Sequence, residues 1–458
     1  MKSLYFMKSL RIPLLFLCAT VIWSCQEDLQ LDQNPNEAPA FKYNQVKPAN
    51  QYKPELAQQW MQMAYNSVKA RGFFALDASR LYAYTSLAMY ESMVHGIPKG
   101  LSMEGQLKSF SQVPKPTENL RYDWGIVLCH ATPIVLNHML QRPNSNIVSD
   151  IVNLERTQER ALVQESNLPS DVIANSKAFA AALADHIIKF ADSDGTTELI
   201  TRQYTMPSIS VNPAFYDGIE QANPFFMLPF WWTARSFVIP AATTCRPLPP
   251  YTYSEDPASK YYQDVLEVLD ATKDKDKVEI GHYWANNPGQ SGTPAGSWVG
   301  IGNQLVNQFK LDLESTIKMY LLLTLSTRDT FIAVWWTKYN WNLQRPVSYI
   351  RRVLRQPGWN SPVPTPPYPD YVSGTSANAG SSSEILTSLF GTRPFTDSQH
   401  SDKGFGTWTY SSFKRAGIDA YHSRIYGGVH MRKACEEGFQ LGECVAREFL
   451  LKLKFTAQ

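Results

Sequence analysis

Apolar residues recur at three- and four-residue spacing over most of this chain, and this period restricts it to a largely helical architecture. The spacing is found in residues 54–70, 78–96, 123–141, 148–166, 170–192, 258–273, 312–340, 376–390, 405–426 and 430–454. Runs with the two-residue alternation of strands are sparse. Hydrophobic residues make up 44% of the 458 positions, which is enough for a large core. We therefore expect an all-α protein.

Composition changes in the middle of the chain. Residues 196–257 are rich in Pro, Ser, Tyr and Trp, and they are too aromatic for a flexible linker. We expect an ordered, loop-rich excursion between an N-terminal helical half, 51–195, and a C-terminal helical half, 258–458. The 43 basic and 41 acidic residues leave a net charge of +2 with no long basic tract, so a nucleic-acid partner is not expected.

The first residues have the pattern of an export signal. Basic residues precede an apolar run from Ile12 to Trp23, which is short for a membrane span, and small Ser24 and Cys25 follow. This pattern predicts a lipoprotein signal over 1–25 with lipidation at Cys25, followed by a polar tether over 26–50. The alternatives are an ordinary cleaved signal or a short anchor. We expect an exported protein, periplasmic or at the outer membrane, that contacts the membrane only through its lipid anchor.

Four cysteines remain for the folded part: Cys129, Cys245, Cys435 and Cys444. An oxidising compartment permits a disulfide, but none of their spacings is typical of a metal site. Cys435 and Cys444 are expected on one helix roughly 13 Å apart, beyond disulfide reach. Any pairing other than that one stays open.

Three short segments carry candidate functional residues. Lys338 and Arg345 are seven residues apart in WWTKYNWNLQRPVSYI, so a continuous helix would place both cations on one face. This face suits a partly buried anion, although a solvated face is the more common case.

The second and third segments add donors for oxygen atoms. Ser373 and Gly374 precede a predicted helix whose free N–H groups would favour an anion, although a plain N-cap has the same pattern. In AYHSRIYGGVHMRK, Arg424 offers a planar fork for two oxygens, and His430 is a candidate nucleophile or metal ligand. His422 competes with His430 for this role.

Together the three segments resemble the superfamily of vanadium-dependent haloperoxidases and type 2 phosphatidic acid phosphatases. Its signature runs Lys-x6-Arg-Pro, then Ser-Gly-His, then Ser-Arg-x5-His. The first element is present as Lys338, Arg345 and Pro346, and the last as Ser423, Arg424 and His430. The detailed resemblance covers about residues 280–445, and the flanking sequence looks like the soluble haloperoxidase branch.

The resemblance implies two packed helical bundles and an oxyanion site. Lys338, Arg345, Ser373, the Gly374 amide and Arg424 would bind the oxygens of vanadate, or of phosphate in the same site. His430 would be the vanadium ligand, or the nucleophile of a phosphatase. The resemblance also places Trp336, Tyr368 and His282 in the substrate vicinity.

This chain departs from the family pattern at two positions. The acid–base histidine of the middle motif is Thr375 here, and a threonine hydroxyl does not titrate near neutral pH. The aspartate that usually lies four residues after the last histidine is Ala434. The group that orients His430 should then be a backbone carbonyl or Glu437.

Three functions remain open on the sequence. The leading hypothesis is a vanadium-dependent haloperoxidase-like enzyme that oxidises an easily oxidised halide, iodide or bromide, with hydrogen peroxide. The second is an acid phosphatase that acts on a phosphoester with His430 as nucleophile. The third is a degenerate lipoprotein that binds an oxyanion or a partner without turnover, for which Thr375 and Ala434 are the evidence.

Overall fold

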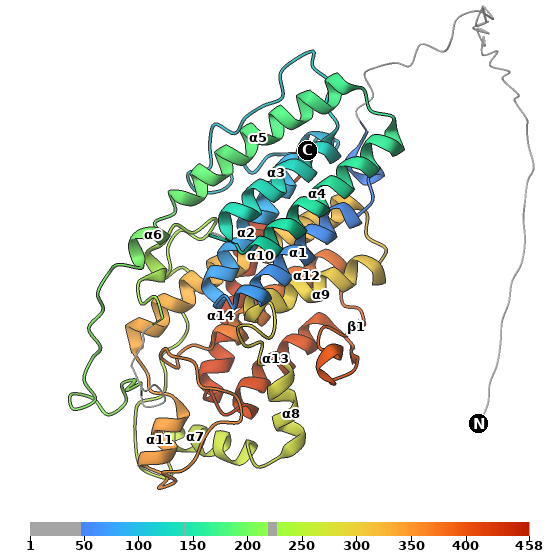
Figure 1. Ribbon diagram of the computed structural model, residues 1–458. Coiled ribbons are helices and arrows are strands. Elements are labelled where there is room, and N and C mark those ends of the chain that lie inside the picture. Colours follow the sequence, from blue (N-terminus) through green and yellow to red (C-terminus); the bar gives the residue numbers. More distant parts are fainter. Residues whose placement is uncertain (1–46, 142, 219–226, 458) are drawn as a thin grey trace, which may run out of the picture. The chain divides into compact units, whose positions relative to one another are not determined.

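The computed structural model describes residues 47–141, 143–218 and 227–457 (Figure 1). The proposed signal, Cys25 and nearly all of the tether lie outside these residues. The described part is helical with one short hairpin, which confirms the all-α prediction. No helix in this part is long and apolar enough to cross a bilayer.

The N-terminal half consists of helices that pack around α2 and α3 (Figure 1). Two of them begin at a polar cap: Asp123 accepts a hydrogen bond from the amide of Ile126 before α3, and Asn144 accepts one from Ile147 before α4. Their bounds are α1 Glu55–Arg71, α2 Ala75–Met93, α3 Trp124–Met139, α4 Ser145–Ser166, α5 Ser170–Asp192 and α6 Thr196–Leu199.

The C-terminal half contains α12 packed on α13 and α14, with α7, α8 and α11 grouped at one end (Figure 1). The bounds are α7 Lys260–Ala271, α8 Lys275–Tyr283, α9 Thr293–Gln308, α10 Leu313–Trp341, α11 Pro346–Arg352, α12 Gly374–Phe390, α13 Phe413–Tyr426 and α14 Arg432–Lys452. Strands β1 Phe395–Asp397 and β2 Trp408–Tyr410 form an antiparallel hairpin.

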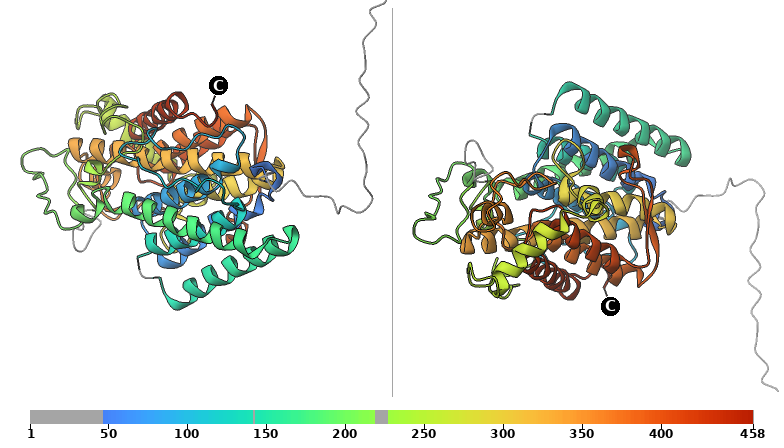
Figure 2. Two further views of the ribbon diagram at one scale, coloured as in Figure 1. Left: turned by 90° about the horizontal axis from the view of Figure 1, so that it is seen from above. Right: turned by 90° about the horizontal axis from the view of Figure 1, so that it is seen from below.

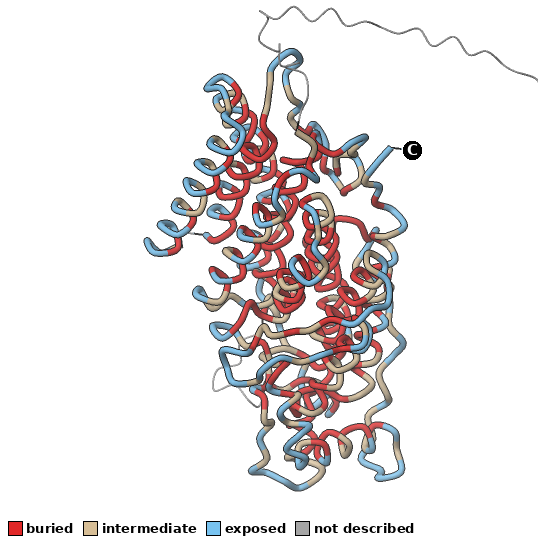
Figure 3. The backbone as a smooth tube through the Cα atoms, turned by 90° about the vertical axis from the view of Figure 1, so that its right-hand side faces the viewer, coloured by how far each residue is buried: buried red, intermediate tan, exposed pale blue. Residues whose placement is uncertain are grey.

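Helix α10 joins the two halves, because it packs against α2 on one side and against α12 and α14 on the other. Nearly all of its residues between Leu313 and Tyr339 are buried. Figure 3 shows buried backbone along the inner helices and exposed backbone at the periphery. Figure 2 shows α4 at the edge in both views, and only Ile147, Ile151, Gln158 and Leu162 of this helix are buried.

Two helical predictions need correction. The segment 405–426 is helical only from Phe413, because Trp408–Tyr410 pairs with β1 instead. Helix α9 was not predicted, because glycines interrupt its apolar period. These glycines allow a close approach: a Cβ at Gly296 would lie 2.5 Å from the Tyr82 hydroxyl. The short helices α8 and α11 were also missed.

The described part of the excursion, residues 196–218 and 227–257, is held by specific contacts. The Asp329 carboxylate accepts hydrogen bonds from the amides of Phe237, Val238 and Ile239 at 2.7 to 3.1 Å. Cys245 forms a disulfide with Cys444 on α14, 199 residues away. Cys435 is a buried free thiol and is not bonded to Cys444, as expected from their spacing.

The disulfide provides a test of how the excursion is anchored. Replacing both Cys245 and Cys444 by Ser should lower the free energy of unfolding by about 2–5 kcal/mol, because the bond closes a very long loop. Urea unfolding measures this change. Wild-type protein treated with reductant should fall to the stability of the variant, and equal stability of oxidised wild type and variant would contradict the anchoring role.

Candidate oxyanion site

The segments predicted to carry function converge at one place. Lys338 comes from the last turn of α10, Arg345 precedes α11, Ser373 precedes α12, Arg424 lies in the last turn of α13, and His430 lies just before α14. All five are buried, with exposed fractions between 0% and 4%. The structure thus brings together groups that are up to 92 residues apart in the sequence.

Lys338 and Arg345 do not lie on one helical face, which corrects the sequence-based prediction. Helix α10 ends at Trp341, and Asn342 adopts a left-handed conformation with φ of 48°. Arg345 is the N-cap residue of α11. The two cations approach one centre because the chain reverses between them, and not because they share a helical stripe.

Lys338 is fixed by main-chain oxygens. Its ammonium donates hydrogen bonds to the carbonyls of Pro369 at 2.7 Å and Asp370 at 3.0 Å. Burial lowers its pKa well below the usual value, and neighbouring Arg345 acts in the same direction. The Tyr368 ring lies 4.9 Å from the ammonium and 4.9 Å from the Arg345 guanidinium, so it forms one wall beside both cations.

Arg345 is held on one side and free on another. Its Nε donates to the Tyr368 carbonyl at 2.9 Å, and its Nη1 donates to the Val429 carbonyl at 2.7 Å. Its Nη2 is buried with no hydrogen-bond partner among the described residues. An unpaired charged donor in the interior is costly, so this nitrogen calls for an acceptor that the protein itself does not provide.

Arg424 has two buried nitrogens without a partner among the described residues, one more than Arg345. Both its Nε and its Nη1 are buried and lack a partner in the described part of the chain. Burial lowers its pKa to about 10, and the charge of Arg345 contributes in the same direction. The three unpaired nitrogens of Arg345 and Arg424 provide a donor set suited to the oxygens of an anion.

The N-terminus of α12 supplies neutral donors. The Ser373 Oγ accepts hydrogen bonds from the Ser376 amide and hydroxyl, at 3.3 and 2.8 Å, and keeps its own hydroxyl proton to donate. It therefore caps the helix, as the more conservative interpretation predicted, and can also contact a ligand. The Gly374 amide begins the helix, where the dipole favours an anion. Thr375 is half-buried in this first turn.

His430 completes the cluster as a neutral imidazole. Its Nε2 lies 3.0 Å from Nη1 of Arg345, and its Nδ1 lies 2.7 Å from Oδ1 of Asp370. Burial lowers its pKa well below the usual value, and Arg345, Lys338 and Arg424 reinforce this effect. A neutral imidazole has one protonated nitrogen and one nitrogen with a lone pair, and a ligand or a nucleophile requires that lone pair.

Glu437 is not the partner of His430, which corrects the second prediction. Its carboxylate accepts from the Leu248 amide at 2.9 Å and from the Lys433 ammonium at 2.7 Å. Sequence reasoning missed Asp370, which lies in the proline-rich loop three residues before Ser373. The signal in the sequence was an acidic residue three positions before the motif.

The three residues predicted in the substrate vicinity, Tyr368, Trp336 and His282, have different surroundings in the structure. Tyr368 borders both Lys338 and Arg345 as described above. Trp336 faces Arg246, whose guanidinium lies 5.5 Å from its ring, whereas Trp335 packs against Tyr368 with ring centroids 5.0 Å apart. His282 is exposed on α8 and lines a surface cavity of about 350 Å³ whose walls include none of the three cations.

Comparison with known proteins supports the fold. The family model of the VCPO second helical-bundle domain matches residues 318–457. A crystal structure described as the first bacterial vanadium-dependent iodoperoxidase superposes with a TM-score of 0.81 at 26% identity, covering 90% of this chain and 99% of that one. Among curated proteins none matches the sequence.

A bacterial vanadium-dependent chloroperoxidase in its holo form matches with a TM-score of 0.58 at 16% identity, covering 89% of this chain and 95% of the other. An apo-form structure of a bacterial vanadium-dependent chloroperoxidase matches with a TM-score of 0.59 at 15% identity, covering 82% of this chain and 94% of that one. At this identity the likeness shows the fold alone. Together with the family model over residues 318–457, the 26% identical structure supports the resemblance to the vanadium haloperoxidase superfamily.

The unpaired donors can be tested without any assumption about turnover. Replacing Arg424 by Ala should weaken binding of orthophosphate by about tenfold or more, since a hydrogen bond to a charged group contributes about 1.5–3 kcal/mol. Isothermal titration calorimetry measures the affinity. Arg156→Ala, at an exposed arginine of α4, is the matched control. Equal affinity of Arg424→Ala and wild type would contradict an anion site at this position.

Proposed function

We propose that this protein is a vanadate-dependent haloperoxidase that oxidises halide with hydrogen peroxide, with iodide or bromide as the favoured substrate. The observation that carries the proposal is the set of three unpaired, buried guanidinium nitrogens next to a neutral imidazole. Three cations and the Asp370 carboxylate leave a formal excess of two positive charges, which suits a multiply charged oxyanion.

The residues present fit vanadate. Lys338, Arg345, Ser373, the Gly374 amide and Arg424 would hold its oxygens, and His430 would be the metal ligand. When bound, vanadate would act as the Lewis acid that activates peroxide. Phosphate would fit the same donors, because both are tetrahedral oxyanions.

The contribution of the chain itself is preorganisation. Lys338 and Arg345 are already fixed by main-chain carbonyls and Ser373 by its place at the α12 cap, so these donors need little reorganisation to bind an anion. Their burial excludes water, which strengthens every charge–charge interaction in the site. Burial also keeps His430 neutral, so Nε2 can serve as a ligand without first losing a proton.

The halide preference rests on Thr375. Its hydroxyl can donate a hydrogen bond but cannot exchange a proton near neutral pH, so the chain lacks the general acid–base group of the family motif. Iodide and bromide are easier to oxidise than chloride, so their oxidation depends least on a general acid–base group. The high structural similarity to an iodoperoxidase supports the same preference.

Phosphatase activity is the second candidate, because a neutral imidazole beside bound phosphate is also the arrangement of a histidine nucleophile. It would require leaving-group protonation, a contribution of about 10²–10⁴-fold that Thr375 cannot supply. We therefore place it below the haloperoxidase. The third possibility, a lipoprotein that binds without turnover, becomes the conclusion if neither activity is found.

We also propose that the protein is exported and anchored by a lipid at Cys25. The Cys245–Cys444 disulfide supports export, since such bonds persist in oxidising compartments. The anchor itself rests on the sequence pattern alone. A Cys25→Ser variant that still partitions into the membrane fraction would contradict it.

The direct test is peroxide-dependent iodide oxidation by the purified mature protein before and after incubation with orthovanadate. We expect turnover that requires vanadate and is lost in His430→Ala. Hydrolysis of a phosphoester that vanadate inhibits, without halide oxidation, would favour the phosphatase instead. Absence of both activities would contradict an enzymatic role.

Thr375→His tests the assigned cause of the preference. Because it restores a titrating group to the middle motif, we expect bromide oxidation to rise by about tenfold or more. The ratio of bromide to iodide turnover is the measurement, and Thr375→Ser is the control that keeps a hydroxyl. An unchanged ratio would show that Thr375 does not set the halide range.

A further inference from the structure

We propose that Asp370 replaces the carboxylate that Ala434 lacks, so that it is the positioning residue that holds the His430 ring with Nε2 directed at the oxyanion. The inference rests on the proposed function in one respect, namely that His430 is the ligand. It concerns a residue outside the three motif elements, and it explains how the site can operate without the aspartate on α14.

Asp370 lies close to His430, Arg345 and Lys338. Its Oδ1 lies 2.7 Å from Nδ1 of His430 and 3.6 Å from Nη1 of Arg345. Its carbonyl accepts a hydrogen bond from Lys338 at 3.0 Å. Its own amide donates to the Leu343 carbonyl at 2.8 Å, which fixes the backbone. The side chain is fully buried.

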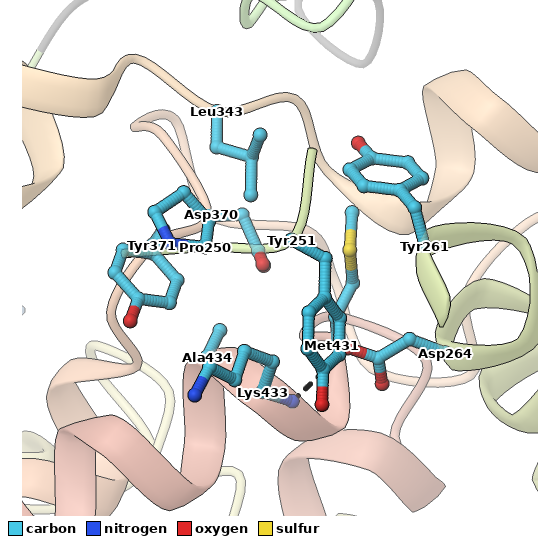
Figure 4. Close-up of a pocket in the computed structure, with 10 residues that line it drawn as sticks. All are labelled: Pro250, Tyr251, Tyr261, Asp264, Leu343, Asp370, Tyr371, Met431, Lys433 and Ala434. Atoms are coloured by element: carbon cyan, nitrogen blue, oxygen red, sulfur yellow. Dashed lines mark hydrogen bonds between the residues drawn. The ribbon is translucent and has the colours of Figure 1, made fainter. Parts of the chain in front are cut away.

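Asp370 and Ala434 line the same small cavity, as Figure 4 shows. The Asp370 carboxylate points into the cavity from the loop before α12, and Ala434 lies across it on α14. The cavity measures about 10 Å³, roughly the space for one water molecule. Position 434 is where the family pattern has its aspartate, and it borders the same cavity as Asp370. We therefore infer that Asp370 supplies the carboxylate that position 434 lacks.

The other acidic groups nearby are engaged elsewhere. Asp264 also lines the cavity, but its carboxylate accepts from the amides of Arg432 at 2.7 Å and Lys433 at 3.1 Å, which caps α14. Glu437 is bound to Leu248 and Lys433, as described above. Asp370 is therefore the carboxylate available to His430 in the described part of the chain.

The tautomer of the ring follows from the contact with Asp370. Arg345 Nη1 can only donate, but it lies 3.0 Å from Nε2 and 3.3 Å from Nδ1, so it does not select the tautomer by itself. We place the proton of the neutral ring on Nδ1, because Oδ1 of Asp370 lies 2.7 Å from this nitrogen. A carboxylate on Nδ1–H fixes the ring and raises the basicity of Nε2, and loss of such a partner typically costs about 10- to 100-fold in metal affinity.

The experiment compares Asp370→Asn, Asp370→Ala and the double variant Asp370→Ala/Ala434→Asp with wild type and with Glu437→Gln. The first readout is the tautomer of His430 without oxyanion, from ¹⁵N chemical shifts of histidine-labelled protein, with His430→Ala for assignment. The second is the affinity for orthovanadate by calorimetry, without peroxide or halide. Asp370→Asn conserves volume, and circular dichroism checks that each variant is folded.

We expect wild type and Glu437→Gln to show the Nδ1–H tautomer and the same vanadate affinity. Asp370→Asn and Asp370→Ala should lose about 10- to 100-fold in affinity and show a mixed tautomer. The Ala434→Asp change should restore affinity at least tenfold in the Asp370→Ala background. Wild-type affinity and tautomer in Asp370→Asn would overturn the proposal, and so would a folded double variant that binds no better than Asp370→Ala.

Failure of this inference is distinguishable from failure of the proposed function. If wild type binds vanadate but oxidises no halide, the haloperoxidase proposal fails, and the tautomer and affinity data still decide the role of Asp370. If halide oxidation is observed but Asp370→Asn behaves as wild type, the function stands and the positioning role is excluded.

Discussion

The burial of three cations around one centre is the constraint on which the rest of this structure depends. Lys338, Arg345 and Arg424 are nearly inaccessible to water, yet among the described residues only Asp370 brings a carboxylate within 4 Å of any of them. Removing such charges from water costs several kcal/mol each unless other groups compensate. The fold tolerates this cost because main-chain carbonyls of Pro369, Asp370 and Val429 accept from two of the cations.

The architecture explains how these groups stay in place. Helix α10 packs against both halves of the protein, so the position of Lys338 is tied to the whole core. The same helix carries Asp329, which anchors the excursion through three main-chain amides. The disulfide and the Glu437–Leu248 hydrogen bond then attach the excursion to α14. The site is thus supported by long-range contacts on several sides.

Much of this arrangement could be predicted from the sequence. The helical period identified most of the long helices, and the motif spacings selected the five side chains that the structure brings together. The errors concern features that the residue pattern within one segment does not reveal. The prediction that Lys338 and Arg345 share one helical face was wrong, because the left-handed residue Asn342 ends the helix between them. The Asp370–His430 contact joins residues 60 apart, and no pattern within either segment indicates it.

The most direct test of the central claim is a crystal structure of the mature protein soaked with orthovanadate. We expect one vanadate per chain, bonded to His430 Nε2, with its oxygens accepting hydrogen bonds from Arg345 Nη2 and from Arg424 Nε and Nη1. Vanadate bound elsewhere, or the same two arginines found with protein partners and no anion between them, would contradict the claim that their burial serves to hold an oxyanion.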